Sequence, residues 1–193
     1  KEVSLGLDQP PVTRYLDWLG GAIHGDFGVS WFTSQPVVGS IIGRLPTTLS
    51  VVLVTIVIVG ILATLLGVTA AVRRGWVDRA LQIVSIGGAA IPQFVLAILI
   101  VTIFAIRLHW FPATGYVPLT TNFGGWIGSI ILPIIALAVG AIASTAQQVR
   151  SATINVLGKD YVRTLRSRGL APGEILFRHV LRGAAPAALT VLS

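Results

Sequence analysis

The residues of this sequence that are best suited to chemistry lie together in one basic stretch, residues 150–186. This stretch holds seven cationic side chains against two acidic ones, namely Arg150, Lys159, Arg163, Arg166, Arg168, Arg178 and Arg182 against Asp160 and Glu174. Apolar runs flank it on both sides. A cationic segment between apolar runs is typical of a cytoplasmic loop at the membrane surface. We therefore interpret it as a surface on which another protein acts.

Catalytic chemistry of the common kinds is missing from the sequence. The phosphate-binding pattern G-x-x-x-x-G-K-[ST] does not occur, and Gly158-Lys159 is followed by Asp160 instead of Ser or Thr. The zinc pattern H-E-x-x-H is absent too. Three histidines are scattered, which favours surface or interfacial histidines over a metal site: His24, His109 and His179. We predict a chain that is not an enzyme, has no metal site and depends on a separate ATPase for ATP-driven work.

Short helices must position the basic stretch. Residues 161–168 contain no helix breaker, and Gly169 follows where a left-handed cap is easiest for glycine. Pro172 suits the first turn of a second helix, because its missing N–H costs nothing there. Glu174 lies in the same turn, where a negative charge is favourable. The second helix is amphipathic, with Ile175, Leu176, Phe177, Val180 and Leu181 as its apolar content and Arg178, His179 and Arg182 as its basic side.

The composition places the chain in the membrane class. Of its 193 residues, 54% are hydrophobic and 11% are charged, whereas a soluble domain carries about 25% charged residues. We predict an all-α polytopic membrane protein with three complete spans and the start of a fourth. The predicted spans are about 48–72, 80–106, 126–146 and 184–193, the last of them truncated. Because the chain begins at Lys1 and stops inside an apolar run, we expect it to be a piece of a longer protein.

The charges of the loops predict the orientation of these spans. Residues 73–79 carry three Arg and residues 147–184 carry seven Lys or Arg, whereas residues 107–125 carry only Arg107. Positive charge favours the cytoplasmic side. The loop 147–183 is then cytoplasmic, and the segment 1–47, with a short amphipathic helix over residues 12–23, lies outside.

Glycine and proline predict where the spans bend. Pro92 should kink the second span because its ring removes a backbone hydrogen bond. A kinked, glycine-rich span suits a transport path, although a kink that merely improves packing is an equal alternative. The residues predicted for this path are Gly87, Gly88, Pro92, Gln93 and Pro133.

Small residues predict close approach between helices. One face of the first span carries Gly60, Ala63, Gly67 and Ala71, and the third span carries a second small stripe at Ala136, Gly140 and Ala143.

The loop also resembles a known family. DYVRTLRSRGL followed by ILFRHVLR is similar to the cytoplasmic loop of bacterial ABC-importer permeases, and more narrowly to the first permease subunit of the dipeptide, oligopeptide and nickel uptake family. Gly169 fills the glycine place of the family motif, and residues 163–165 fill its Glu-Ala-Ala places, with Leu165 departing from the alanine usual in the peptide branch. The segments GLDQP, YLDWLGG, GDFGVS, IPQF and WFPATG match the family as well.

This resemblance implies a type I-like ABC-importer permease whose loop couples to an ATPase. The implied coupling residues are Asp160, Tyr161, Arg163, Thr164, Leu165, Arg166, Ser167, Arg168, Gly169, Leu170, Glu174, Phe177 and Arg178. The implied partners are a second homologous permease, two ATP-binding subunits that use ATP and Mg, an extracytoplasmic substrate-binding protein, a peptide substrate and the bilayer of the bacterial inner membrane. No cofactor is implied for this chain itself.

Three alternatives stand beside this interpretation. The chain could be a membrane anchor or receptor whose basic loop recruits a cytoplasmic partner without transport. It could belong to an importer of nickel or glutathione. A helix-turn-helix DNA reader would need a soluble, exposed recognition helix, and short helices tethered between spans argue against any nucleic-acid partner.

Overall fold

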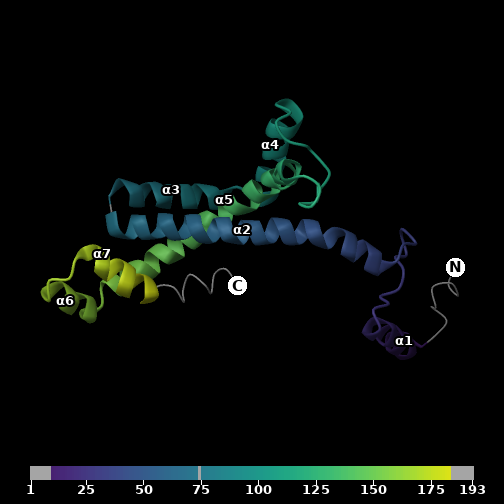
Figure 1. The fold of residues 1–193 in the computed structure, drawn as a ribbon, viewed down its shortest axis with the longest axis horizontal. Helices are drawn as coiled ribbons and strands as arrows, with labels where there is room; N and C mark the ends of the chain where they lie inside the picture. The colour runs from purple at the N-terminus through teal and green to yellow at the C-terminus, as the bar shows by residue number, and fades with distance from the viewer. Residues whose placement is uncertain (1–9, 74, 184–193) are drawn as a thin grey trace. The chain divides into compact units, whose positions relative to one another are not determined.

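The computed structural model describes residues 10–73 and 75–183, and these are almost entirely helical (Figure 1). Its contacts divide the chain into two compact units, residues 1–49 and 50–193, which are described separately. Within the described residues, extended pairing is limited to a single bridge between Val29 and Pro36. The predicted all-α class is confirmed. The predicted start of a fourth span at 184 lies outside the described residues.

The first unit contains helix α1, Pro11–Ile23, which confirms the short helix predicted over residues 12–23. Pro11 stands at the start of α1, where a missing N–H costs nothing. The turn-rich loop that follows uses Gly25 and Gly28, both with positive φ. The loop closes with the Val29–Pro36 bridge, directly before helix α2.

Two long apolar helices dominate the chain: α2, Val37–Arg73, and α5, Phe123–Leu157. Both are long and apolar enough to cross a membrane. The Asn122 side chain caps α5 by accepting hydrogen bonds from the N–H groups of Gly124 and Gly125, at 2.9 and 3.3 Å. Many large apolar side chains of α2 are exposed, among them Leu53, Ile61 and Leu65, as expected for helices that face lipid or other subunits.

Both helices extend beyond the predicted spans. Helix α2 begins at Val37 and continues through Pro46, and α5 continues from residue 146 to Leu157. The predicted ends were placed where polar and charged residues begin, but these do not break a helix. Gly158 follows the end of α5, and it is the first glycine or proline after Gly140. The membrane boundaries inside these helices stay predictions.

The predicted second span is two helices instead of one kinked helix. Helix α3, Trp76–Ala90, ends before Ile91 and Pro92, and helix α4, Gln93–Ile100, continues into a π-helical segment η2, Val101–Arg107. The two arms are bent by 93°. The prediction of a single bent helix is corrected to a break, because Ile91 adopts an extended conformation with ψ of 119° before the proline. Within the described residues, two helices are therefore long and apolar enough to cross a membrane, or three segments if the bent pair counts as one span.

The helices pack through small residues around α5. Gly67 of α2 lies so close to α5 that an added Cβ would come within 2.6 Å of the Ala146 carbonyl oxygen and 2.8 Å of the Val149 Cβ. Val59 and Ala63 of α2 share a buried cluster with Ala138 and Ala146 of α5. The predicted close approach is confirmed at Gly67 and Ala63. Helix α3 packs on the later half of α5, whereas α4 and η2 pack on the earlier half, near Leu132 and Ala136.

The loop between η2 and α5 is tied to the spans by polar side chains. The Ser50 and Tyr116 hydroxyls are 2.9 Å apart, and Trp126 Nε1 donates to Ser50 Oγ at 3.3 Å. These contacts join the loop to Ser50 of α2 and to the first turn of α5.

Candidate functional site

The basic stretch begins in the last turns of α5 and continues as helix α6, Asp160–Ser167, which ends in a glycine corner. Gly169 has a φ of +81°, a left-handed conformation that glycine adopts without strain. Its N–H donates to the Arg166 carbonyl at 3.0 Å, and the Leu170 N–H donates to the Leu165 carbonyl at 3.3 Å. These two bonds form a Schellman motif, which satisfies the last carbonyls of a helix. The predicted helix and glycine corner are confirmed.

The part of the stretch after the glycine corner is a helix whose π-helical segment was not predicted. It begins as α7, Pro172–Glu174, with proline in its first turn as predicted, and continues as the π-helical segment η3, Ile175–Val180. Ile175 and Val180 are five positions apart, and both are buried, at 2% and 0% exposure. A π-helix repeats its hydrogen bonds every five residues, so both side chains face the same core.

That core fastens the loop to the end of α5. Val156 of α5 packs with Val162 of α6 and with Ile175 and Val180 of η3. Leu165 and Leu170, which flank the glycine corner, pack against the same cluster. Val162 is fully buried. The two short helices and the last turns of α5 therefore share one apolar core.

The charges of the loop face away from this core. The Arg163 side chain lies 3.8 Å from Asp160, and Arg178 lies 3.5 Å from Glu174, but all four are well exposed, at 77%, 98%, 75% and 47%. Exposed ion pairs of this kind contribute little to stability. The exposed surface also includes the guanidinium-bearing residues Arg166 and Arg168 and two aromatic side chains, Tyr161 and Phe177.

Polar side chains within α6 are used locally. Thr164 Oγ1 donates to the Asp160 carbonyl at 3.2 Å, and Ser167 Oγ donates to the Thr164 carbonyl at 2.8 Å. Together with the residues named above, they place every predicted loop residue on one folded unit: α6, its glycine corner and the start of the second helix.

A pocket of about 580 Å³ lies behind the loop. It is lined mainly by apolar residues of α2, α5 and the second loop helix, with the Arg166 side chain as its charged member. The loop thus carries exposed basic side chains and also borders a pocket lined mainly by apolar residues.

The residues predicted for a transport path are less closely gathered. Gln93 reaches α5, where its Nε2 lies 3.5 Å from the Leu137 carbonyl oxygen and it lies beside Gly140. Gly87 and Gly88 have open space where a Cβ would be. Pro133 is exposed and lies within the unbroken helix α5. A shared path for these residues stays a prediction.

Sequence reasoning missed an ion pair between two helices. Asp78 lies in the first turn of α3, and both of its carboxylate oxygens accept hydrogen bonds from the Arg150 guanidinium of α5. Arg150, where the predicted basic stretch begins, lies inside α5, and no local pattern links it to an acid 72 positions away. The one available signal was the lone carboxylate in the otherwise basic loop 73–79.

Comparison with known proteins identifies the family. A family model described as the binding-protein-dependent transport system inner membrane component matches residues 63–193. The chain belongs to this family. The matched part begins within α2 and includes the bent pair, α5 and the whole basic loop.

Individual relatives are peptide transport proteins by name. A putative peptide transport system permease protein of Brucella abortus is 40% identical over 190 residues, covering 98% of this chain and 60% of the relative. An oligopeptide transport system permease protein of Bacillus subtilis is 35% identical over 190 residues, covering 96% and 60%. A di/tripeptide transport system permease protein of Pseudomonas aeruginosa is 34% identical over 208 residues, covering 97% and 62%. The chain spans about 60% of the length of such relatives, and the predicted membership in this permease family is confirmed.

Proposed function

We propose that this chain is part of the translocation subunit of an ATP-driven importer for di- or oligopeptides in a bacterial inner membrane. Membership in a family of inner membrane transport components supports the membrane role. The names of the relatives in Brucella and Bacillus support peptides over nickel or glutathione as the substrate. The apolar exposed surfaces of α2 and α5 support placement in a bilayer.

The basic loop is the docking surface for an ATP-binding subunit in this proposal. The observation that carries it is the apolar core of Val156, Val162, Ile175 and Val180. Because this core joins α6 and η3 to α5, a push on the loop is passed to a membrane helix instead of being lost in a flexible tether. The exposed arginines and the exposed Phe177 supply contacts for a partner.

The chemistry of ATP belongs to other chains in this proposal. Two ATP-binding subunits would hydrolyse ATP with Mg, a second permease would complete the path, and a substrate-binding protein would deliver the peptide. Closure of the ATP-binding subunits would move the loop, and the helices would change their tilt so that access alternates between the two sides of the membrane.

A site-directed cross-link tests the docking proposal. Residues 1–193 contain no cysteine, so a Ser167→Cys substitution adds the one thiol of this part of the permease, on exposed α6. Any cysteine elsewhere in the full-length permease is replaced first. In the assembled transporter, a short thiol cross-linker should join this position to the ATP-binding subunit, and the yield should change with bound nucleotide. Thr114→Cys, exposed in the loop before α5, is the matched control and should give no such product.

Measurements of ATP hydrolysis and peptide uptake distinguish a transporter subunit from a membrane anchor. Reconstituted complex whose ATP hydrolysis rises with peptide-loaded binding protein supports the importer. A complex that contains the chain but shows neither substrate-stimulated hydrolysis nor peptide uptake would favour a non-transporting anchor. Mass spectrometry of the solute bound to the purified complex distinguishes a peptide from nickel or glutathione.

A further inference from the structure

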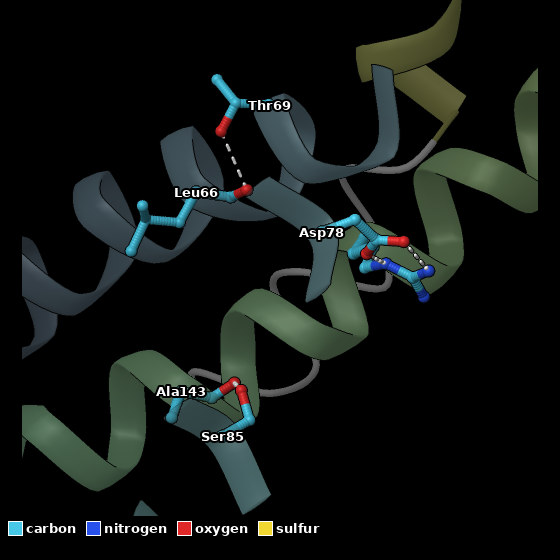
Figure 2. A network of polar contacts seen from close by, with 6 residues as sticks. Leu66, Thr69, Asp78, Ser85 and Ala143 are labelled. Carbon is cyan, nitrogen blue, oxygen red and sulfur yellow. Dashed lines mark hydrogen bonds and ion pairs between the residues drawn. The ribbon is translucent and has the colours of Figure 1, made fainter. Parts of the chain in front are cut away.

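The contact between Asp78 and Arg150 is built differently from the other ion pairs of the described chain. Arg150 Nε donates to Asp78 Oδ1, and Arg150 Nη2 donates to Asp78 Oδ2 at 2.8 Å, so two guanidinium nitrogens meet two carboxylate oxygens (Figure 2). This paired geometry fixes orientation as well as distance. The two side chains are only 20% and 16% exposed.

Burial makes this pair sensitive to the loss of either partner. Removing one member of a shielded pair leaves the other charge without its compensating partner. By contrast, Asp160–Arg163 and Glu174–Arg178 each lie within one helical turn and are exposed, so their loss should change little.

The pair stands between the basic loop and the broken span. Arg150 lies in α5, seven positions before that helix ends at Leu157, and the loop core continues from Val156. Asp78 opens α3, the helix that leads to the break at Pro92. The charged pair thus lies on the route from the loop to α3, in addition to the packing of Leu81 and Ser85 on α5.

Further polar contacts hold α3 and the first residue of α4 against α5. Ser85 Oγ donates to the Ala143 carbonyl at 3.2 Å (Figure 2). Gln93 Nε2 lies 3.5 Å from the Leu137 carbonyl oxygen. Both side chains meet a backbone carbonyl through a single contact, whereas Asp78 and Arg150 hold each other through two charged contacts. The charged pair is therefore the strongest polar tie of this series.

We propose that Asp78 and Arg150 are positioning residues that make α3 follow α5 when the basic loop is displaced. With the pair intact, movement of α5 is delivered to the break at Pro92, and the bent span changes its angle. Without it, α5 slides along α3, and the bent span stays where it was. This inference rests on the proposed function, since it assumes that an ATP-binding subunit moves the loop.

The decisive measurement is the number of peptides taken up per ATP hydrolysed by the full transporter in proteoliposomes. Asp78→Asn and Arg150→Gln should each lower this ratio by about 2–30-fold, the range expected for residues along a coupling route, while substrate-stimulated hydrolysis persists. Exchange of the charges, Asp78→Arg together with Arg150→Asp, should recover most of the ratio. Arg79→Gln, which removes an exposed charge one position away, is the control and should leave the ratio unchanged.

A second arm guards against variants that assemble poorly. Asp78→Cys together with Arg150→Cys lacks both charges, and a short cleavable cross-linker between the two thiols should restore the ratio in the same sample. Cleavage of the linker should lower it again. Single variants with the original ratio, or a cross-link without effect, would overturn the inference even though the unaltered transporter works. Failure of the unaltered transporter to couple peptide uptake to ATP would instead remove the proposed function.

Discussion

Gly169 carries the change of direction between the two loop helices. Its φ of +81° is a conformation that costs side-chain-bearing residues roughly 1–2 kcal/mol, and the cost is highest for a β-branched residue. An added side chain would meet no atom within 4 Å, so the penalty comes from the backbone alone. Glycine is required at this position by the backbone conformation and not by a lack of space.

Gly169→Val should therefore abolish peptide uptake while the protein still inserts into the membrane. The substitution would open the Schellman motif and turn α6 away from η3. Uptake of a labelled peptide by cells, with the amount of permease in membranes measured in parallel, checks this. Gly173→Ala is the control, because Gly173 is helical, also has open space and lacks a positive φ. Normal uptake by Gly169→Val would show that the corner is dispensable.

At the residue scale, local patterns were predictable and distant partners were not. The glycine corner could be predicted because the helical stretch, Gly169 and Pro172 all lie within about a dozen neighbouring positions. The partnership of Asp78 with Arg150 could not, since it depends on how α3 docks on α5. A single sequence does not reveal how two distant helices dock on each other.

The crossing of α2 over α5 has its closest approach at Gly67. Gly67→Ala would place a Cβ within 2.6 Å of the Ala146 carbonyl oxygen, which is backbone and cannot rotate away. The helices would have to separate, and overpacking of this kind costs about 1–3 kcal/mol.

The expected result is a lower thermal stability of the purified transporter in detergent, measured by loss of assembled complex on heating. Gly43→Ala in the same helix has open space around it and should be neutral or slightly stabilising, because alanine favours helix. Equal melting of the two variants would contradict the close crossing.

At the scale of elements, the sequence predicted the types of helix better than their ends. Charges marked the predicted span ends, but α5 continues for several turns beyond residue 146 because Val149, Thr153 and Val156 keep one face buried. Pro92 was predicted to bend one helix, and the extended Ile91 before it separates two helices instead. The size of such a bend depends on packing against α5, which no local pattern contains.

The orientation of the spans is testable with single thiols, because residues 1–193 contain no cysteine that would react as well. Thiols at Trp76 and Arg168 should be protected from an impermeant reagent added outside intact cells, and a thiol at Thr114 should react. All three positions are exposed. The charges of the loops and the contact of Asp78 with Arg150 both place the Trp76 and Arg168 ends together.

This labelling also decides how often the bent pair crosses. If α3 and α4 form one crossing, Trp76 and Thr114 lie on opposite sides of the membrane. If the pair enters and returns on one side, they share a side. Reaction of Arg168→Cys from outside would invert the topology and remove the basis for docking to an ATP-binding subunit.

At the scale of the whole molecule, composition alone predicted a membrane protein, and the loop motif predicted its family. The number of membrane crossings could not be predicted as well. A proline break has the same sequence pattern in a bent span and in a re-entrant segment. The solute and the partner subunits stay proposals, because a single sequence does not encode the surfaces that other chains would contribute.

The π-helical segment Ile175–Val180 allows the effect of a one-residue deletion to be tested. A π-turn holds one residue more than an α-turn, so deletion of a single amino acid there would let the helix relax to ordinary winding. The described residues after the deletion would keep their face toward the loop core, because the ordinary α-helical winding compensates for the missing residue. A one-residue deletion inside this segment should therefore be tolerated better than one inside α6, which has ordinary α-helical winding and no extra residue to lose. A library of one-residue deletions scanned for growth on peptides would show the difference.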